Sequence, residues 1–129
     1  MVDYQATGLQ DQQIPPFIAI TVYRVVQEAL GNILKHANAR NVSIILDSRP
    51  DYILVIIEDD GCGFEVERVW KEHGQRHLGL LGMKERTKLA KGSFHIESEI
   101  GSGTTVYVRI PIVGEEDGTS DGKIAHFPG

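Results

Sequence analysis

Cysteine is almost absent from this chain of 129 residues, in which Cys62 is the single thiol. One thiol cannot form an internal disulfide, and it excludes a cysteine-rich zinc site. We therefore expect a protein of a reducing, intracellular compartment. The length is that of one domain, and a core of this size folds without disulfides or a structural metal.

An excess of positive charge is also missing, because 13 Lys and Arg stand against 18 Asp and Glu and give a formal net charge of -5. This balance argues against a general nucleic-acid-binding protein. Long hydrophobic runs are missing too: the apolar stretch 53–57 has the length of a strand and falls far short of the roughly 20 residues of a membrane helix. Since polar residues follow Met1, we expect no secretory signal, no membrane segment and a cytoplasmic location.

The two ends of the chain have little apolar content. Residues 1–13 are polar and rich in glutamine, and the rigid Pro15-Pro16 pair follows them. Residues 114–129 are acidic and rich in glycine. The composition predicts a linker over 1–13, one folded domain over 14–113 and a disordered tail over 114–129.

Apolar residues recur every three or four positions between Phe17 and Ala37, namely Ile18, Val22, Val26, Ala29, Ile33 and Ala37. That spacing predicts an amphipathic helix. Two β-branched runs follow at 42–46 and 52–57, and two more lie at 93–98 and 104–110, so we expect two β-hairpins. Between the hairpins, the polar stretch 68–77 predicts a loop with a short helix, and a second long helix is expected from Gly79 to Gly92.

Glu28, Asn32 and His36 are four residues apart, so they lie on one stripe of the first helix. A carboxylate, an amide oxygen and an imidazole at this spacing suit a hydrated Mg²⁺ and the phosphates that it carries, and Lys35 adds a positive charge nearby. The solvated side of any amphipathic helix has the same composition. Spacing alone leaves both interpretations open.

The motif Asp59-Asp60-Gly61-Cys62-Gly63 follows an apolar strand, and its glycines let the backbone turn against a flat ligand. An aspartate in this motif can accept a hydrogen bond from an exocyclic amine. A buried acceptor of this kind discriminates against ligands that lack the donor. An ordinary Asp-Gly turn explains the same residues.

Two further glycine motifs are present. Gly79-Leu80-Leu81-Gly82, at the expected helix start, offers free backbone N–H groups and the positive end of the helix dipole to phosphate, although a glycine cap explains it as well. Gly101-Ser102-Gly103-Thr104 joins two strands and needs no ligand. The chain has neither a P-loop nor the dinucleotide-binding glycine signature, which excludes those two nucleotide sites.

In their order along the chain, these four motifs resemble the catalytic ATP-binding domain of two-component sensor histidine kinases, within the superfamily of gyrase, heat-shock chaperone, histidine kinase and mismatch-repair ATPases. The resemblance spans about residues 14–112. The stretch 23–32, YRVVQEALGN, with Lys35-His36-Ala37, looks like the N box of the nitrate-sensor-like subgroup. The stretch 77–86, HLGLLGMKER, looks like the second glycine box of that subgroup. Asp60 departs from the pattern, because many relatives carry asparagine there.

The resemblance implies a Bergerat-type α+β fold, a two-layer α/β sandwich with helices packed on one face of a mixed sheet. It also implies that ATP and Mg²⁺ bind between the helices and a mobile lid. Asn32 would ligate Mg²⁺, Glu28 would hold the metal or polarise an attacking group, and Asp59 would accept the adenine amine. The other residues that it assigns to ATP binding are Lys35, His36, Gly61, Gly63, His77, Gly79, Leu80, Leu81, Gly82, Gly101, Gly103 and Thr104.

The implied reaction transfers the γ-phosphoryl group of ATP to a histidine on a separate dimerisation domain, with a response regulator acting downstream. None of the five histidines of this chain has the context of a phosphoacceptor. The resemblance therefore implies an isolated catalytic domain that is monomeric and acts on a partner helix, without nucleic acid. A related serine kinase or ATPase of the superfamily, and a non-catalytic nucleotide-responsive interaction module, are the alternatives.

Overall fold

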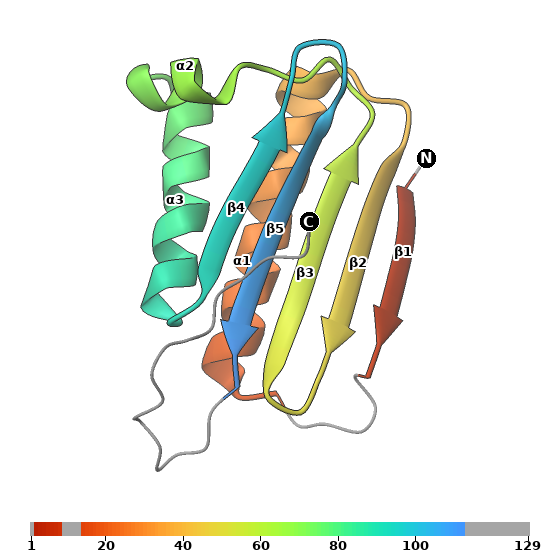
Figure 1. Ribbon diagram of the computed structural model, residues 1–129, viewed down its shortest axis with the longest axis vertical. Coiled ribbons are helices and arrows are strands. Elements are labelled where there is room, and N and C mark those ends of the chain that lie inside the picture. The colour runs from red at the N-terminus through yellow and green to blue at the C-terminus, as the bar shows by residue number, and fades with distance from the viewer. Residues whose placement is uncertain (1, 9–13, 113–129) are drawn as a thin grey trace.

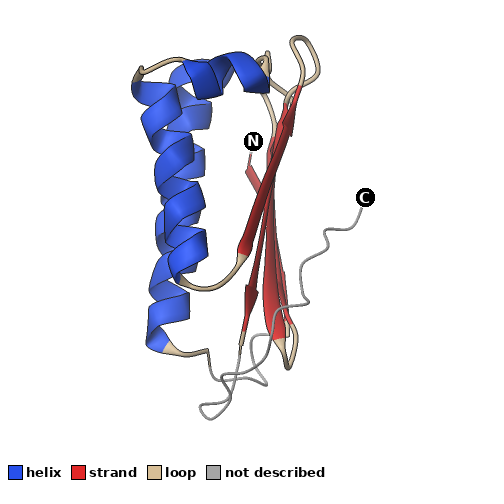
Figure 2. Cartoon of the chain, turned by 60° about the vertical axis from the view of Figure 1, so that its left-hand side comes forward, coloured by secondary structure: helices blue, strands red, loops and turns tan. Residues whose placement is uncertain are grey.

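The computed structural model describes residues 2–8 and 14–112, which form one mixed sheet with helices on one face (Figures 1 and 2). The strand order is β1-β2-β3-β5-β4, and only the β1–β2 pair is parallel among these described strands. The expected α+β sandwich is confirmed. The elements are β1 (Val2–Thr7), α1 (Pro16–Asn32), the π-helical turn η2 (Ile33–Ala37), β2 (Val42–Ser48), β3 (Tyr52–Asp59), α2 (Val66–Lys71), α3 (Gln75–Leu89), β4 (Ser93–Ser98) and β5 (Thr104–Pro111).

The core lies between the sheet and the helices because the central strands alternate in burial. In β3, Ile53, Val55 and Ile57 are at most 1% exposed, and each pairs with an equally apolar residue of β5. Side chains two apart on a strand point to the same face, so this face is continuous across the sheet. The helices cover this face of the sheet and contribute Val25, Ala29, Leu80 and Met83 to the core.

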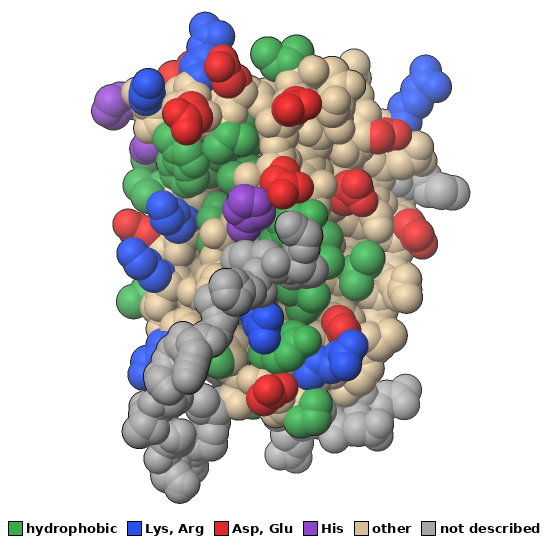
Figure 3. Space-filling view, viewed as in Figure 1, with side chains coloured by type: hydrophobic (Ala, Val, Ile, Leu, Met, Phe, Trp, Pro, Cys, Tyr) green, Lys and Arg blue, Asp and Glu red, His purple; other side chains and the backbone are tan. Residues whose placement is uncertain are grey.

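None of the described helices covers the opposite face of the sheet, which carries hydrophobic side chains between charged ones (Figures 2 and 3). Ile45, Ile56 and Tyr107 form one row across β2, β3 and β5, and each is half-buried. Because successive strand residues alternate between faces, Asp59 and Thr104 lie on the other side, under the helices. The helical face is therefore where the predicted site residues gather.

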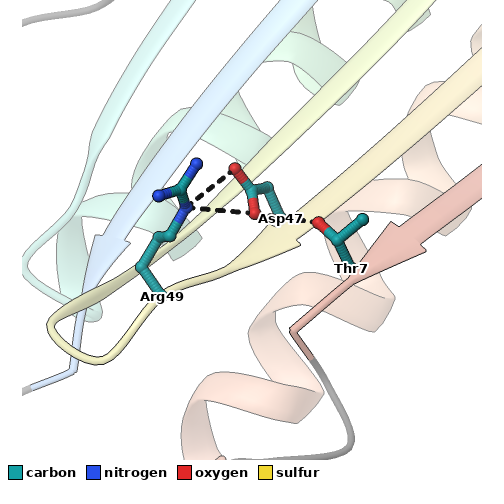
Figure 4. Close-up of polar contacts among 3 residues, drawn as sticks. All are labelled: Thr7, Asp47 and Arg49. Carbon is teal, nitrogen blue, oxygen red and sulfur yellow. Dashed lines mark hydrogen bonds and ion pairs between the residues drawn. The ribbon is translucent and has the colours of Figure 1, made fainter.

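Strand β1 lies within the stretch expected to be a linker, and for residues 2–7 that expectation is wrong. The strand is the edge of the sheet and is exposed along its whole length. Its last residue, Thr7, is held through its own side chain, because the Thr7 hydroxyl donates to Asp47 at 2.9 Å. Arg49 pairs with the same carboxylate at 3.1 Å (Figure 4). The polar composition conceals a period-two pattern, because Val2, Tyr4 and Ala6 alternate with polar residues.

The first helix is close to its prediction. It begins at Pro16 and passes into η2, which ends where Asn38 takes a left-handed conformation with φ of 53°. Over Pro16–Ala37 this segment is long and apolar enough to be a candidate membrane span by length and composition, whereas the sequence analysis expected none. In this fold Val25 and Ala29 of the segment belong to the core.

The second long helix begins four residues earlier than expected. Helix α3 starts at Gln75, so the glycines expected at its N-terminus lie within it. The Leu78 N–H already donates to the Gly74 carbonyl at 3.1 Å. Only the backbone N–H groups that precede Leu78 in α3 therefore have no acceptor within the helix. The helix ends at Leu89, and Gly92, the expected end, donates its N–H to the Thr87 carbonyl at 2.9 Å. The expected tail, 114–129, lies outside the described residues.

Candidate functional site

A cavity of about 40 Å³ lies between the helices and the ends of the central strands. Helix α1 and η2 contribute Asn32 and His36 to its wall, the strands contribute Asp59 and Thr104, and α3 contributes Arg76. The remaining lining residues are Ala29, Ile33, Ala37, Ile57, Gly63, Phe64, Leu80, Met83, Ile96 and Val106. A space of this size holds a few water molecules, whereas ligand pockets measure roughly 300–1,000 Å³. A larger ligand therefore needs more space than this cavity offers.

Asp59 ends β3 at the sheet side of the cavity. Only 5% of its surface is exposed, and one carboxylate oxygen accepts the Gly61 N–H at 2.7 Å. Burial raises the pKa of Asp59, although the hydrogen bond from the Gly61 N–H opposes the rise. The second carboxylate oxygen accepts no hydrogen bond from another described residue, so the group is an acceptor facing the cavity.

The glycines after Asp59 are required by close backbone packing. A Cβ atom on Gly61 would overlap the Ala37 carbonyl oxygen, which also accepts the Cys62 N–H at 2.8 Å. Gly63 has a φ of 66°, and a Cβ atom there would overlap the Glu99 carbonyl oxygen. The loop is therefore tied to η2 on one side and to the β4–β5 hairpin on the other.

Asp60 serves this loop rather than the cavity. Its carboxylate accepts the backbone N–H groups of Arg40 and Asn41 and the side-chain amide of Asn41, each at 2.9 Å. These bonds, those of Asn41 first, hold the pKa of Asp60 below its usual value. The aspartate that departs from the family pattern thus fixes the turn that follows η2.

The polar stripe of the first helix reaches the cavity in part. Asn32 and His36 line it, and Glu28 is exposed beside it. The His36 Nε2 atom is buried without a hydrogen-bond partner among the described residues. Burial, and then the positive charges of Arg76 and Lys35, lower the pKa of His36, so the neutral imidazole is favoured. A nitrogen without a partner here suits a phosphate oxygen.

Glu28 and Asn32 lie together against Gly79 of α3. A Cβ atom on Gly79 would be 2.5 Å from the Glu28 carboxylate oxygen and 3.2 Å from each terminal atom of the Asn32 side chain. The Glu28 carboxylate and the Asn32 amide therefore lie close together, and oxygens of these two kinds suit Mg²⁺, an ion that takes few protein oxygens and keeps several waters. No described group of three or more His, Cys, Asp or Glu side chains forms a complete protein cage.

Several predicted residues lie outside the cavity wall. His77 faces α2, where its Nδ1 is 3.2 Å from the Val69 carbonyl oxygen and its ring meets the edge of Trp70. Lys35 and Gly101 are exposed, and the space around Gly82 is open. Leu81 and Gly103 are also absent from the wall, although Gly103 carries the turn before Thr104 with a φ of 80°. Contact of these residues with nucleotide stays a prediction.

The sequence analysis missed two residues of the candidate site, Arg76 and Ser98. The Arg76 guanidinium lies 4.6 Å from the centre of the Phe64 ring and closes the cavity beside His36. Arg76 was placed only within the polar stretch 68–77, and an isolated cation-π pair leaves no pattern in sequence. Ser98 bonds Phe64, Gly103 and Thr104 at once. A single serine in a strand gives no signal either.

Comparison with known proteins gives one consistent answer. The family model for the histidine kinase-, DNA gyrase B-, and HSP90-like ATPase matches residues 18–114. The chain is 34% identical over 112 residues to the signal transduction histidine-protein kinase/phosphatase DegS of Bacillus subtilis, covering 86% of this chain and 29% of that protein. It is 36% identical over 113 residues to the sensor protein VraS of Staphylococcus epidermidis, covering 88% of this chain and 31% of that protein.

Solved structures agree with these relatives. The histidine kinase domain of the blue-light activated histidine kinase of Erythrobacter litoralis EL346 superposes with a TM-score of 0.67 at 26% identity, over 86% of this chain and 51% of that chain. The chain spans about 30% of the length of the curated relatives. It belongs to the histidine kinase-, DNA gyrase B-, and HSP90-like ATPase family, and it is a histidine kinase catalytic ATPase domain.

Proposed function

We propose that this domain binds Mg-ATP in the cavity and transfers the γ-phosphoryl group to a histidine on a separate helical dimerisation domain. The observation that carries the proposal is the pairing of two sites across one cavity. A buried carboxylate acceptor, Asp59, lies at the sheet side, and the Glu28–Asn32 oxygen pair lies at the helix side. This arrangement matches a ligand with an amine at one end and metal-bound phosphates at the other.

At the sheet side, we assign Asp59 to accept the adenine amine, with Thr104 beside it. The two residues face each other in register on β3 and β5. Gly61 and Gly63 let the loop pack against the backbone of Ala37 and Glu99, and this packing fixes the loop beside Asp59. A buried acceptor rejects bases without the donor, since the carboxylate would then stay unpaired.

At the helix side, Asn32 and Glu28 would hold Mg²⁺, which neutralises charge on the phosphate oxygens when bound. We assign the free Nε2 of His36 to a phosphate oxygen, and Arg76 to the same region once it leaves Phe64. Glycine at position 79 allows α3 to approach this group of side chains. The protein thus mainly positions the two reactants.

In the proposed transfer, an imidazole nitrogen of the partner attacks the γ-phosphorus, the bond to the bridging oxygen breaks, and ADP leaves with the electron pair. As the alternative to holding the metal, the exposed carboxylate of Glu28 would polarise the attacking imidazole of the partner. We propose a cytoplasmic setting, because the reaction consumes ATP, and a response regulator as the later recipient of the phosphoryl group.

The test uses the purified chain, labelled ATP and the dimerisation domain of the parent kinase. We expect acid-labile, alkali-stable phosphohistidine on the added domain and no steady phosphate release from the chain alone. Asn32→Ala should abolish transfer, while Ser102→Ala, on the exposed hairpin, should keep it. Acid-stable phosphoserine would instead identify a serine kinase, and full transfer by Asn32→Ala would overturn the metal-ligand assignment.

A further inference from the structure

The Ser98 hydroxyl lies at the centre of three hydrogen-bonding contacts at the sheet side of the cavity. The Phe64 N–H donates to it at 2.8 Å, it donates to the Gly103 carbonyl at 3.1 Å, and it lies 2.7 Å from the Thr104 hydroxyl oxygen. Ser98 is half-buried at the end of β4 and pairs with Thr104 in register. The three contacts connect the loop after β3, the β4–β5 turn and the cavity wall.

One assignment of protons satisfies all three contacts. A serine hydroxyl has one proton and two lone pairs. The Gly103 carbonyl can only accept, so the Ser98 proton goes to it. The Phe64 N–H and the Thr104 hydroxyl must then donate to the two lone pairs of Ser98. The proton of Thr104 is therefore turned away from the cavity.

This assignment fixes the chemistry that Thr104 presents to a ligand. Thr104 lines the cavity, and because its proton is donated to Ser98, its oxygen can only accept from a ligand there, as can the carboxylate of Asp59, opposite it in register. Side chains paired in this way on one sheet face have Cβ atoms about 5 Å apart. The sheet side of the cavity thus presents two acceptors close together. A 6-amino purine has two N–H donors for them, whereas a 6-oxo purine presents an acceptor.

We propose that Ser98 is a specificity-determining residue, which holds the Thr104 hydroxyl as an acceptor and so makes the cavity selective for 6-amino over 6-oxo purine nucleotides. The inference rests on the proposed function, because it needs the base to lie against Asp59 and Thr104. Without Ser98, the Thr104 hydroxyl is free to turn its proton into the cavity and donate to a 6-oxo group. Ser98 acts through Thr104 and is a positioning residue.

The test is the ratio of the affinities for Mg-ATP and Mg-ITP, measured by calorimetry on the whole chain. Ser98→Ala should lower the ATP-to-ITP affinity ratio about tenfold, the effect of one mismatched buried hydrogen bond, and should raise the absolute affinity for ITP. Ser98→Thr keeps the hydroxyl and should keep the ratio. Ser102→Ala is the matched control, because Ser102 lies on the same hairpin outside the cavity wall, and it should also keep the ratio.

The outcomes separate the two claims. If Ser98 had only a structural role, its loss would lower the affinities for Mg-ATP and Mg-ITP by the same factor. An unchanged affinity ratio in Ser98→Ala would therefore overturn the inference, while the proposed ATP binding would stand. If the wild-type chain bound neither nucleotide, the proposed function would fail and the inference with it. Should circular dichroism show that Ser98→Ala is unfolded, Ser98→Cys keeps the side-chain size with a much weaker hydrogen bond and should lower the ratio in the same direction.

Discussion

The two ends of the cavity differ in how completely their polar groups are bonded. At the sheet side, Asp59 accepts the Gly61 N–H, Ser98 bonds Gly103 and Thr104, and glycines fix the loop around them; one Asp59 oxygen accepts no hydrogen bond from another described residue. At the helix side, a buried nitrogen of His36 has no hydrogen-bond partner within residues 2–8 and 14–112, and α3 occupies the space beside Glu28. In the proposed function, the sheet side receives the base with little change, whereas the helix side must rearrange to receive the phosphates.

This contrast follows from what each end rests on. The sheet side stands on β3 and β5, whose inward-facing residues are among the most deeply buried of the described chain, so its geometry is fixed by the core. The helix side depends on α2 and the first turns of α3, where the residues at 71–75 are all exposed. Segments with few buried apolar contacts open at low cost, as a lid requires. The predictions below test the contrast.

The largest expected effect is on folding, at the sheet side. Gly61→Ala forces a methyl group into the Ala37 carbonyl, which backbone packing cannot move aside, and should cost about 3 kcal/mol of unfolding free energy. Gly31→Ala is the control, since nothing lies within 4 Å of that position in α1, and it should stabilise the chain by about 0.5–1 kcal/mol. Urea denaturation measures both. Equal stability of the two variants would contradict the close packing at Gly61.

A glycine-to-alanine substitution at the helix side should affect nucleotide binding more than folding stability. Gly79→Ala places a methyl group against the Glu28 and Asn32 side chains, whose ends can swing away, so thermal stability should change little. The methyl group then occupies the approach to the proposed metal ligands, and affinity for Mg-ATP should fall about tenfold. Gly82→Ala, in open space on the same helix, should bind ATP normally. Equal affinities in the two variants would remove Gly79 from the site.

A third prediction concerns the cost of keeping a carboxylate buried. Because the pKa of Asp59 is raised in the folded chain, its carboxyl group ionises more readily in the unfolded chain. The folded chain therefore loses stability as pH rises through that raised pKa. Asp59→Asn removes the charge and should raise the melting temperature of the nucleotide-free chain at pH 7 by roughly 3 °C. Scanning calorimetry at pH 4 and pH 7 checks this, since the gain should shrink at the lower pH. A lower melting temperature at pH 7 would show that the carboxylate stabilises the fold.

The smallest effect comes from His36. Its lowered pKa favours the neutral imidazole in the folded chain, so its contribution to stability is full above the usual pKa of 6.5 and is lost as pH falls through the lowered value. His36→Gln should flatten this acid limb of the stability curve between pH 7 and pH 5. An unaltered limb in His36→Gln would exclude His36 as its source.

Most of the fold could be predicted from the sequence because its strongest signals are periodic. The three- and four-residue spacing from Ile18 to Ala37 marks a helix that packs one face on the sheet, and the β-branched runs mark four of the strands. Strand β1 could not be predicted in this way, since its exposed edge position allows polar residues. The start of α3 was missed because Gln75, Arg76 and His77 are polar, and the apolar pattern begins only after them.

The site was predictable where glycine or aspartate is needed by the backbone. Asp59, Gly61 and Gly63 form one motif because the loop must pass Ala37 and Glu99 without side chains. The direction of a hydroxyl proton has no such signature. Ser98 and Arg76 act through contacts between segments far apart in the chain, and only the three-dimensional structure brings these segments together.

The most direct test of the account is a calorimetric titration of the folded chain with Mg-ATP, beside Asp59→Asn. Loss of the buried acceptor should weaken binding about 100-fold, equivalent to about 3 kcal/mol, because an amide in its place presents a donor to the adenine amine. The account predicts binding by the wild-type chain and its near loss in the variant. Equal binding by both, or no binding by a folded wild-type chain, would contradict the placement of the nucleotide in this cavity.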